Sequence, residues 1–378
     1  MGKINVGLDV TSWLYGRGVS NYTANLAGAL AARRDVELQL YACAGRHVAF
    51  FQKKWAEIFS VPLPAYCWQK WPVELNYHWW HHVGINPVGP LLPGVQVFHS
   101  WDYQQPPDRD LPLVSTIHDV AMVKNKTRVH PRIWRHHQES WEILKQRRAH
   151  IIAVSHSDKH DIVELLDFPE QRVHVVYEAL PAQNVVAKDY ISERRLARLR
   201  AKLRIDRDYI LFVGTREPRK NLARLIEAWQ PLSGSYDLVL AGAPGWEEPD
   251  YTDPCIRVVD QPEKNDLALL YAGAAALAFV SLDEGFGLPI LEAYYYGVPV
   301  VTSVHTACEE VAGAAAVLVN PESVNAITLG LQKVLAETPA QKRARVAAGR
   351  SQLKKFAWKK AAAETVAVYR QALEEADE

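Results

Sequence analysis

Residues 276–297 read ALAFVSLDEGFGLPILEAYYYG and show the repeating unit of the fold. A short apolar run (276–280) predicts a buried strand, two glycines mark a loop, and residues 289–296 have the pattern of a helix. A strand followed by a glycine loop and a helix is typical of the βα units that build a parallel sheet.

The same alternation extends over the whole chain of 378 residues, which is long enough for two α/β domains. Expected strands in the first half cover residues 4–9, 36–42, 95–99, 113–118, 151–154 and 173–177. Those in the second half cover 209–213, 236–241, 256–259, 276–280, 299–302 and 316–319. A polar stretch near residues 180–193 predicts a boundary, giving domains at 1–182 and 183–356, with a last helix at about 357–378 packing back on the first domain.

The composition excludes several classes of protein. Hydrophobic residues make up 48%, and the 43 Lys and Arg balance the 43 Asp and Glu, which disfavours a general nucleic-acid binder. The four cysteines form no CxxC pair and read as reduced thiols of a cytoplasmic protein. No apolar run has the length of a membrane span, so we expect a cytoplasmic protein, at most peripheral at the inner face of the membrane.

The glycine loop carries two carboxylates, Glu284 and Glu292, one in the loop and one about a turn into the helix. Gly285 and Gly287 allow backbone amides to approach a ligand, and a helix N-terminus favours an anion such as a diphosphate. Carboxylates accept hydrogen bonds from sugar hydroxyls, so one can read a hexose and the other a ribose. The alternative is a buried helix-capping Glu with a surface Glu, which would not explain the clustered glycines.

A second turn, Gly214-Thr-Arg-Glu-Pro-Arg-Lys-Asn221, follows a strand that ends at Val213. It places Arg219 and Lys220 at the carboxyl end of that strand, where α/β folds bind ligands. Cations there suit a diphosphate, with Arg acting as a fork and Lys as a point charge. The alternative interpretation is a solvated basic turn.

Two weaker signals lie in the first half. The loop after the first strand contains Gly16 and Gly18, but Asn21 stands where a dinucleotide fingerprint has its third glycine. His118 ends a strand and is a candidate for contact with a donor sugar or for stabilising developing charge; the alternative is a hydrogen-bonded core histidine. Ser155, at the end of another strand, is a candidate of the same kind.

Taken together, these residues resemble the retaining glycosyltransferases of family 4, whose GT-B fold has two Rossmann-like domains with a deep cleft between them. The paired glutamates match, and the turn at 214–221 looks like the family's GT-x-x-PRKN variant of mannosyltransferase-like members. Further similar segments are AGAPGW at 241–246, LYAGA at 270–274, GVPVV at 297–301, EVAG at 310–313 and FAW at 356–358. The resemblance covers most of residues 205–370 and is confined to short segments before that.

The resemblance implies a hexosyltransferase that retains the anomeric configuration and uses no metal or other cofactor. It implies catalytic roles for His118, Glu284, Arg219 and Lys220. Donor contacts would come from Gly16, Gly18, Gly214, Thr215, Arg216, Asn221, Gly285, Phe286, Gly287, Leu288 and Glu292. Thr215 departs from the family because many members have an arginine there, so the phosphate charge comes from Arg216 or Arg219 with Lys220.

The expected reaction moves mannose from GDP-mannose to a glycan or lipid-linked glycan in polysaccharide biosynthesis. The alternatives are a UDP-sugar-dependent glucosyl or N-acetylglucosaminyl transferase, a non-catalytic nucleotide-sugar-binding protein and an NAD-dependent oxidoreductase.

Aromatic residues at 68–80, with Trp101 and Tyr103, would stack on acceptor sugars or fill the core. His78, His81 and His82 have helical spacing, but the flanking tryptophans favour a packed or acceptor-facing helix over a metal site. A basic helix at 194–204 is either a solvated face or a contact for anionic lipid. The acceptor, the linkage and the oligomeric state are not determined by the sequence.

Overall fold

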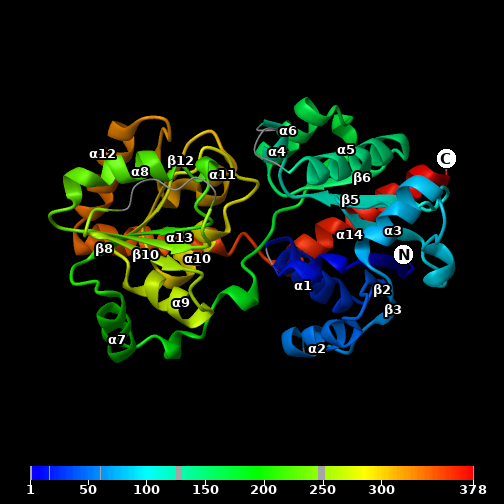
Figure 1. The fold of residues 1–378 in the computed structure, drawn as a ribbon, viewed down its shortest axis with the longest axis horizontal. Helices are drawn as coiled ribbons and strands as arrows, with labels where there is room; N and C mark the ends of the chain where they lie inside the picture. The colour runs from blue at the N-terminus through cyan, green and yellow to red at the C-terminus, as the bar shows by residue number, and fades with distance from the viewer. Residues whose placement is uncertain (1, 17, 60, 125–129, 246–251, 378) are drawn as a thin grey trace. The chain divides into compact units, whose positions relative to one another are not determined.

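The computed structural model describes residues 2–16, 18–59, 61–124, 130–245 and 252–377. They form two compact units: unit 1 comprises Met1–Pro181 and Ala357–Glu378, and unit 2 comprises Ala182–Phe356. Each unit is a sheet with helices on both of its faces (Figure 1).

The sheet of unit 1 has seven parallel strands in the order β3-β2-β1-β4-β5-β6-β7. Its strands are β1 (Ile4–Asp9), β2 (Val36–Cys43), β3 (Ala65–Gln69), β4 (Val97–Trp101), β5 (Leu113–Ile117), β6 (His150–Ala153) and β7 (Val173–Val175). The chain builds outward from β1 to β3 and then returns to β4 beside β1. The strand order therefore reverses between β1 and β4, and ligands of such folds bind at the carboxyl ends of the strands there.

The helices of unit 1 are α1 (Gly18–Ala31), α2 (Val48–Ile58), α3 (Val73–His78), α4 (Ala121–Lys124), α5 (Pro131–Gln146), α6 (His156–Leu166) and α14 (Trp358–Asp377). Short helical turns are η1 (Thr11–Tyr15), η2 (Trp79–Val83), η3 (Gly89–Leu91) and η5 (Glu170–Arg172). The C-terminal helix α14, red in Figure 1, packs beside α1 and against β4, β5 and β6. Buried His99 joins it to the sheet, since its Nδ1 lies 2.7 Å from the Tyr369 hydroxyl and its Nε2 2.8 Å from Thr116 Oγ1.

The sheet of unit 2 has six parallel strands in the order β10-β9-β8-β11-β12-β13. Its strands are β8 (Tyr209–Val213), β9 (Asp237–Gly242), β10 (Ile256–Asp260), β11 (Ala276–Phe279), β12 (Val300–Ser303) and β13 (Val317–Val319). This is the doubly wound order of a Rossmann-like domain, with its reversal between β8 and β11. The central strands β8 and β11 are buried on both faces, and for this reason they appear in the sequence as continuous apolar runs.

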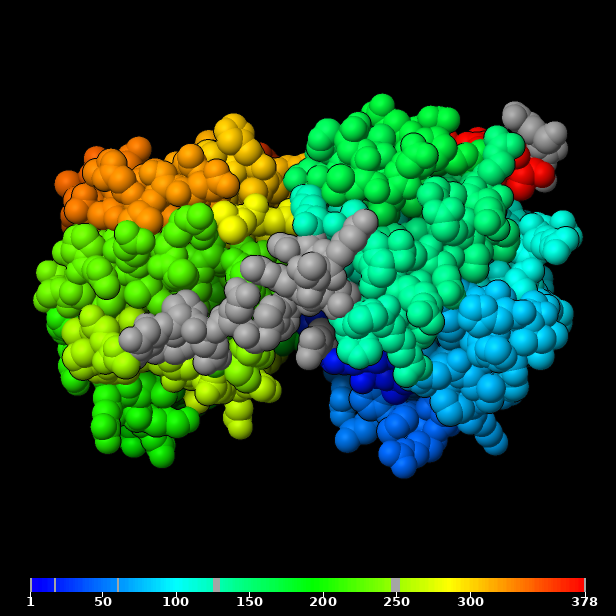
Figure 2. Space-filling view, turned by 45° about the horizontal axis from the view of Figure 1, so that its top comes forward, coloured from blue at the N-terminus to red at the C-terminus, as the bar shows by residue number. Residues whose placement is uncertain are grey.

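The helices of unit 2 are α7 (Glu193–Leu203), α8 (Leu222–Trp229), α9 (Lys264–Gly273), α10 (Leu288–Tyr296), α11 (Ala307–Ala312), α12 (Val324–Leu335) and α13 (Pro339–Leu353). Short helical turns are η6 (Ala182–Asn184), η7 (Lys188–Tyr190), η8 (Pro218–Lys220), η9 (Gln230–Leu232) and η10 (Gly313–Ala315). In Figure 2, α12 and α13 form the orange part of the surface of this unit.

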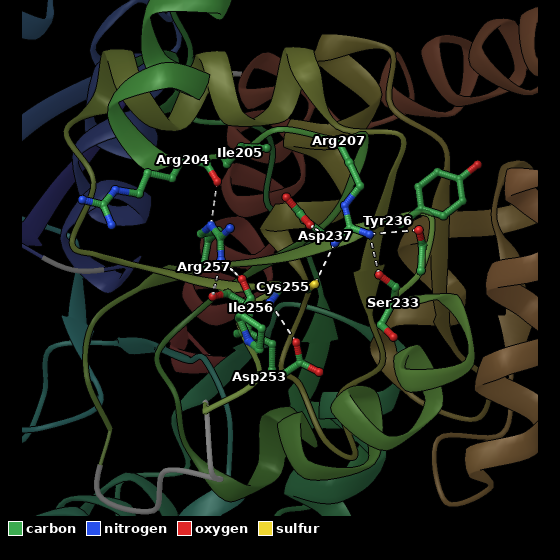
Figure 3. A network of polar contacts seen from close by, with 12 residues as sticks. Arg204, Ile205, Arg207, Ser233, Tyr236, Asp237, Asp253, Cys255, Ile256 and Arg257 are labelled. Atoms are coloured by element: carbon green, nitrogen blue, oxygen red, sulfur yellow. Dashed lines mark hydrogen bonds and ion pairs between the residues drawn. The ribbon is translucent and has the colours of Figure 1, made fainter.

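At the amino ends of the strands of unit 2, the side chain of Arg207 connects two neighbouring segments (Figure 3). The Arg207 guanidinium lies 2.7 Å from Asp237 Oδ1 and 2.7 Å from Cys255 Sγ, and it also donates to the carbonyls of Ser233 and Gly234. One side chain thus links the segments that begin β9 and β10, at the edge opposite the carboxyl ends of the strands.

All twelve expected strands are found within two residues of their expected bounds, and the structure differs from the prediction in two details. The edge strand β3 was not expected. The fourth strand begins at Val97 rather than 95, because the amide of Val95 donates to Leu92 O in a turn, and it continues to Trp101. Within the described ranges, no helix is both long and apolar enough to cross a membrane.

Candidate active site

Three of the predicted residues come together at the reversal point of unit 2. Lys220 ends the turn after β8, and Glu284 lies in the loop between β11 and α10. Lys220 Nζ is 2.5 Å from Glu284 Oε1, and Arg219 Nη1 is 3.0 Å from Glu284 Oε2. One carboxylate is therefore bound by two adjacent cations, and each of its two oxygens contacts one of them.

This cluster is largely removed from water. The side chains of Glu284 and Lys220 are 8% and 10% exposed, and that of Arg219 is 29% exposed. Burial raises the pKa of Glu284, but the charges of Lys220 and then Arg219 outweigh it and hold the pKa below its usual value. Glu284 is therefore ionised at neutral pH and accepts hydrogen bonds without donating any.

Lys220 keeps donors available for a ligand. Among the described residues its ammonium has one hydrogen-bond acceptor, Glu284, and its Nζ lies 5.2 Å from the centroid of the Phe279 ring. An ammonium group has three N–H donors. A nearly buried cation with unused donors at the carboxyl edge of a parallel sheet is suited to a phosphate oxygen.

Asn221 connects the turn to the neighbouring loop. It has a positive φ of 62°, and its amide donates to Val280 O at 3.0 Å and to Pro321 O at 2.6 Å. The amide of Leu282 also donates to Arg219 O at 2.8 Å. The buried Asn221 amide is thus used by the protein itself, and its position fixes the two cations against the loop of Glu284.

In the glycine turn after β8, the backbone of Gly214 lies very close to that of Gly242 at the end of β9. A Cβ added to Gly242, whose φ is 152°, would lie 2.0 Å from Gly214 O. Gly214 itself has a φ of 155°, and its amide donates to Ala241 O at 3.0 Å. Thr215 follows it half-buried, with its carbonyl accepting from the amide of Glu217. These contacts join the carboxyl ends of β8 and β9.

Arg216 points to a different partner from Arg219. Its residue is 3% exposed, its Nη2 lies 2.6 Å from Asp260 Oδ1, and its Nη1 lies 3.3 Å from Gly242 O. Asp260 ends β10, and two strands, β9 and β8, lie between β10 and β11, which leads to the Glu284 loop. The structure therefore separates the two arginines that the sequence left as alternatives.

The glycine loop leads directly into α10. Gly287 caps the helix with a φ of 109°, and Leu288 and Pro289 begin it. The Phe286 ring is turned inward, 4% exposed and at 5.6 Å from the Phe356 ring, so this side chain serves packing and is not a contact for a ligand. The first turn of α10 supplies amides and the positive end of a helix dipole.

Glu292 lies on α10 and is separate from the Glu284 cluster. Its Oε2 accepts from the Tyr271 hydroxyl at 2.6 Å and its Oε1 from Asn184 Nδ2 at 2.7 Å. Burial raises the pKa of Glu292, and these two hydrogen bonds partly oppose the rise. Tyr271 lies in the LYAGA segment noted in the sequence, whereas nothing in the sequence pattern identified Asn184 as its partner.

The remaining predicted residues lie in unit 1. Gly16 caps the end of η1 and Gly18 is the first residue of α1, and a Cβ on either would meet no atom within 4 Å. Arg17 between them, and Trp246 of the AGAPGW segment, lie outside the described residues.

His118 follows β5, and its Nδ1 lies 3.9 Å from Glu178 Oε1. Burial lowers the pKa of His118, but Glu178, Asp102 and Asp119 raise it above its usual value. Ser155 caps α6 by accepting from the amide of Asp158 at 2.9 Å. His118 is thus a polar side chain beside a carboxylate, whereas Ser155 has a local capping role.

The helical segment that contains His78, His81 and His82 is hydrogen-bonded to a neighbouring segment through His81. His81 Nε2 accepts from the amide of Gln105 at 2.9 Å, and burial lowers the pKa of His81 to about 3. Among the described residues, no group of three or more His, Cys, Asp or Glu side chains is arranged to hold a metal ion.

Comparison with known proteins identifies the family. The model of Glycosyltransferase Family 4 matches residues 16–183, and that of Glycosyl transferases group 1 matches residues 197–351. O-antigen chain mannosyltransferase B of Escherichia coli is 31% identical over 273 residues, covering 68% of this chain and 70% of that protein. O-antigen chain mannosyltransferase RfbU of Salmonella typhimurium is 29% identical over 189 residues, covering 47% and 48%.

A solved structure has the same fold. The crystal structure of a glycosyltransferase from Rickettsia africae superposes with a TM-score of 0.69 over 99% of both chains, at 13% identity. This confirms the expected GT-B class of two Rossmann-like α/β domains. With the family matches and the O-antigen relative, it follows that the chain belongs to the family 4 glycosyltransferases and is itself a glycosyltransferase.

Proposed function

We propose that this enzyme transfers mannose from GDP-mannose to a hydroxyl group of a glycan or lipid-linked glycan, with retention of the anomeric configuration and without a metal ion. The observation that carries the proposal is the contact of Lys220 and Arg219 with Glu284 at the reversal point of unit 2. This arrangement puts two cations and an ionised carboxylate side by side, which are the groups that a diphosphate and an adjoining sugar require.

Each residue of this cluster has a proposed task. Lys220 and Arg219 bind the diphosphate and oppose the negative charge that develops on the leaving phosphate, as a metal ion does in other enzymes. Arg219 is the phosphate arginine, because Arg216 is buried against Asp260. Glu284 accepts hydrogen bonds from hydroxyls of the transferred sugar, and its low pKa makes it unsuited to act as an acid.

The other contacts follow from position. Main-chain amides at 285–288 and the N-terminus of α10 face the phosphate or the sugar. Glu292 accepts a hydrogen bond from the ribose in exchange for that of Asn184. His118 in unit 1 carries positive charge over a wider pH range than an ordinary histidine, which suits contact with the sugar or the leaving phosphate. The leaving phosphate takes the proton of the acceptor hydroxyl on the same face of the sugar.

The relatives support the choice of mannose and of a glycan acceptor. Both curated relatives described above are named as O-antigen chain mannosyltransferases. Polysaccharide synthesis in the cytoplasm, with peripheral contact of the basic helix α7 with a membrane, completes the proposal.

A thermal-shift panel tests the donor. GDP, UDP, ADP and their sugars would be compared with NADH as a control, and a ligand at a hundred times its Kd adds about 2.7 kcal/mol of stability. We expect shifts with GDP and GDP-mannose. A shift with UDP compounds alone would replace the donor, and no shift with any nucleoside diphosphate would reject the proposed site.

Transfer in the presence of EDTA tests the metal-free mechanism. Radiolabelled GDP-mannose would be incubated with manno-oligosaccharides, and the anomeric linkage of the product determined by NMR. We expect an unchanged rate with EDTA and an α-linked product. A rate lost with EDTA and restored by a divalent cation would contradict the role given to Lys220 and Arg219.

A further inference from the structure

Aromatic side chains in unit 1 form a continuous row, here called the aromatic ladder: Tyr15, Trp101, Tyr103, His136 and Tyr77. Ring centroids lie 5.4 Å apart for Tyr15 and Trp101, 5.2 Å for Trp101 and Tyr103, 5.0 Å for Tyr103 and His136, and 3.9 Å for His136 and Tyr77. The Tyr103 hydroxyl shares a hydrogen bond with His136 Nδ1, and the Tyr77 hydroxyl donates to Glu139 at 2.5 Å. The inner members are therefore fixed by packing and by polar contacts.

The outer end of the ladder is open. Tyr77 is 4% exposed, Trp101 and Tyr103 are half-buried, and Tyr15 is 51% exposed. Within the described part of the chain the Tyr15 hydroxyl makes no hydrogen bond. A large aromatic ring that is supported by a fixed indole on one side and remains half-exposed offers a flat apolar surface with a polar tip.

The ladder lies at the reversal point of the unit 1 sheet. Tyr15 ends η1, which directly follows β1, and Trp101 is the last residue of β4. β1 and β4 are the two strands between which the strand order reverses. This is the position in unit 1 that corresponds to the Lys220–Glu284 cluster in unit 2, and it is where open α/β sheets bind ligands.

Carboxyl groups contribute to the electrostatic surroundings of Tyr15 and Trp101. Burial raises the pKa of Tyr15, and Tyr103, Glu74 and Asp9 raise it further. Asp102, next to Trp101, is buried and faces His137 Nδ1 at 3.6 Å. Carboxylates beside an aromatic ring favour a ligand with hydroxyl groups and disfavour an anionic one.

We propose that Tyr15 and Trp101 are the acceptor platform of this enzyme, on which one pyranose ring of a neutral glycan stacks. The proposal rests on the proposed glycosyl transfer and adds the class of acceptor. A neutral sugar, and not a lipid phosphate, lies against this face of unit 1.

The experiment compares Tyr15→Ala and Tyr15→Phe with a matched control. Tyr66 is 45% exposed and stacks on Trp68 at 4.8 Å, but both lie on the edge strand β3, away from the reversal point. With α-mannobiose as acceptor, Tyr15→Ala should raise the acceptor KM about tenfold or more, equal to about 1.4 kcal/mol, with kcat and the thermal shift by GDP little changed. Tyr15→Phe keeps the ring and should stay close to wild type, as should Tyr66→Ala.

Direct binding of α-mannobiose, measured by saturation-transfer NMR, separates this proposal from the proposed function. Binding that is lost in Tyr15→Ala but present in Tyr66→Ala supports the platform even if GDP-mannose is not the donor. An acceptor KM within twofold of wild type in Tyr15→Ala, or an equal loss in Tyr66→Ala, would overturn the platform and leave the transferase assignment standing. Binding of decaprenyl phosphate but not of α-mannobiose would overturn it as well.

Discussion

Replacing Glu284 with glutamine tests the centre of the proposed site. The change keeps the shape of the side chain but removes the negative charge that lies between Lys220 and Arg219. Removing one partner of a buried ion pair costs about 3–5 kcal/mol, because the other charge stays buried without compensation. Arg219 is 29% exposed and also pairs with Glu217 at 2.7 Å, so we expect the lower end, about 3 kcal/mol. In a domain of this size that lowers Tm by about 6–12 °C.

The response of the Glu284→Gln variant to GDP and to GDP-mannose tests the assignment directly. If Lys220 and Arg219 hold the diphosphate, GDP supplies the negative charge that Glu284→Gln has lost. GDP should then stabilise the variant at least as much as the wild type. The additional stabilisation by GDP-mannose over GDP should disappear, because the carboxylate that reads the sugar is gone. Mannose transfer should fall about a hundredfold or more.

Glu337→Gln is the matched control in the same unit. Glu337 is 9% exposed and pairs with Arg345, whose Nε lies 2.6 Å from Glu337 Oε1, so the change removes a carboxylate that is equally buried. It should lower Tm by a similar amount and leave the response to GDP-mannose unchanged. Calorimetry with each ligand, followed by a transfer assay, measures both effects. A Glu284→Gln variant that still prefers GDP-mannose to GDP would refute the reasoning.

Three further changes test separate parts of the structure. Glu292→Gln should weaken GDP binding about tenfold to a hundredfold if the carboxylate holds the ribose. In that case 2′- or 3′-deoxy-GDP should bind wild type and variant with the same affinity. If calorimetric titration finds that the variant binds both deoxy nucleotides as much more weakly as it binds GDP, Glu292 has no role at the ribose. Gly242→Ala should lower stability by at least about 2 kcal/mol, because its Cβ would meet Gly214 O, and chemical denaturation would measure the loss. His118 has a raised pKa, so its charge stabilises the fold fully below pH 6.5 and this contribution is lost as the pH rises through the folded value. Glu178→Gln should therefore lower the pKa of His118, visible by NMR titration, and an unchanged value would contradict the pairing.

The sequence predicted the parts of the fold that have continuous apolar strands. The strands at 4–9 and 209–213 were predicted with the bounds they have, because they are buried on both faces and end at glycine or polar residues. The edge strand β3 escaped prediction, because only one side of an edge strand is paired and its residues Ala65 and Tyr66 are exposed. Trp68 in this strand was therefore interpreted as part of a group of core or acceptor contacts and not as part of a strand.

The candidate site was predictable in its residue types but not in its pairings. Lys220 and Glu284 each follow a strand, and parallel strands bring their carboxyl ends to one edge, so their proximity follows from the topology. Asn184, one of the two partners of Glu292, and Glu178, the partner of His118, lie outside the long helices and strands and far from these residues in the chain. Residue spacing contains no information about such contacts, because they depend on how loops cross the edge of the sheet.

The two arginines of the glycine turn show how the backbone decides between equal sequence candidates. Arg216 follows the turn where the chain passes β9, and its amide donates to Ala243 O, which directs the side chain toward Asp260. Arg219 lies in the helical turn η8, and the carbonyl of Arg219 accepts a hydrogen bond from the amide of Leu282 in the Glu284 loop. A single backbone hydrogen bond thus places Arg219 beside Glu284, while a similar bond turns Arg216 away. The proposed phosphate contact therefore depends on which neighbouring segment the main chain of each arginine joins. A separation of three residues in the sequence is enough to give the two side chains different partners.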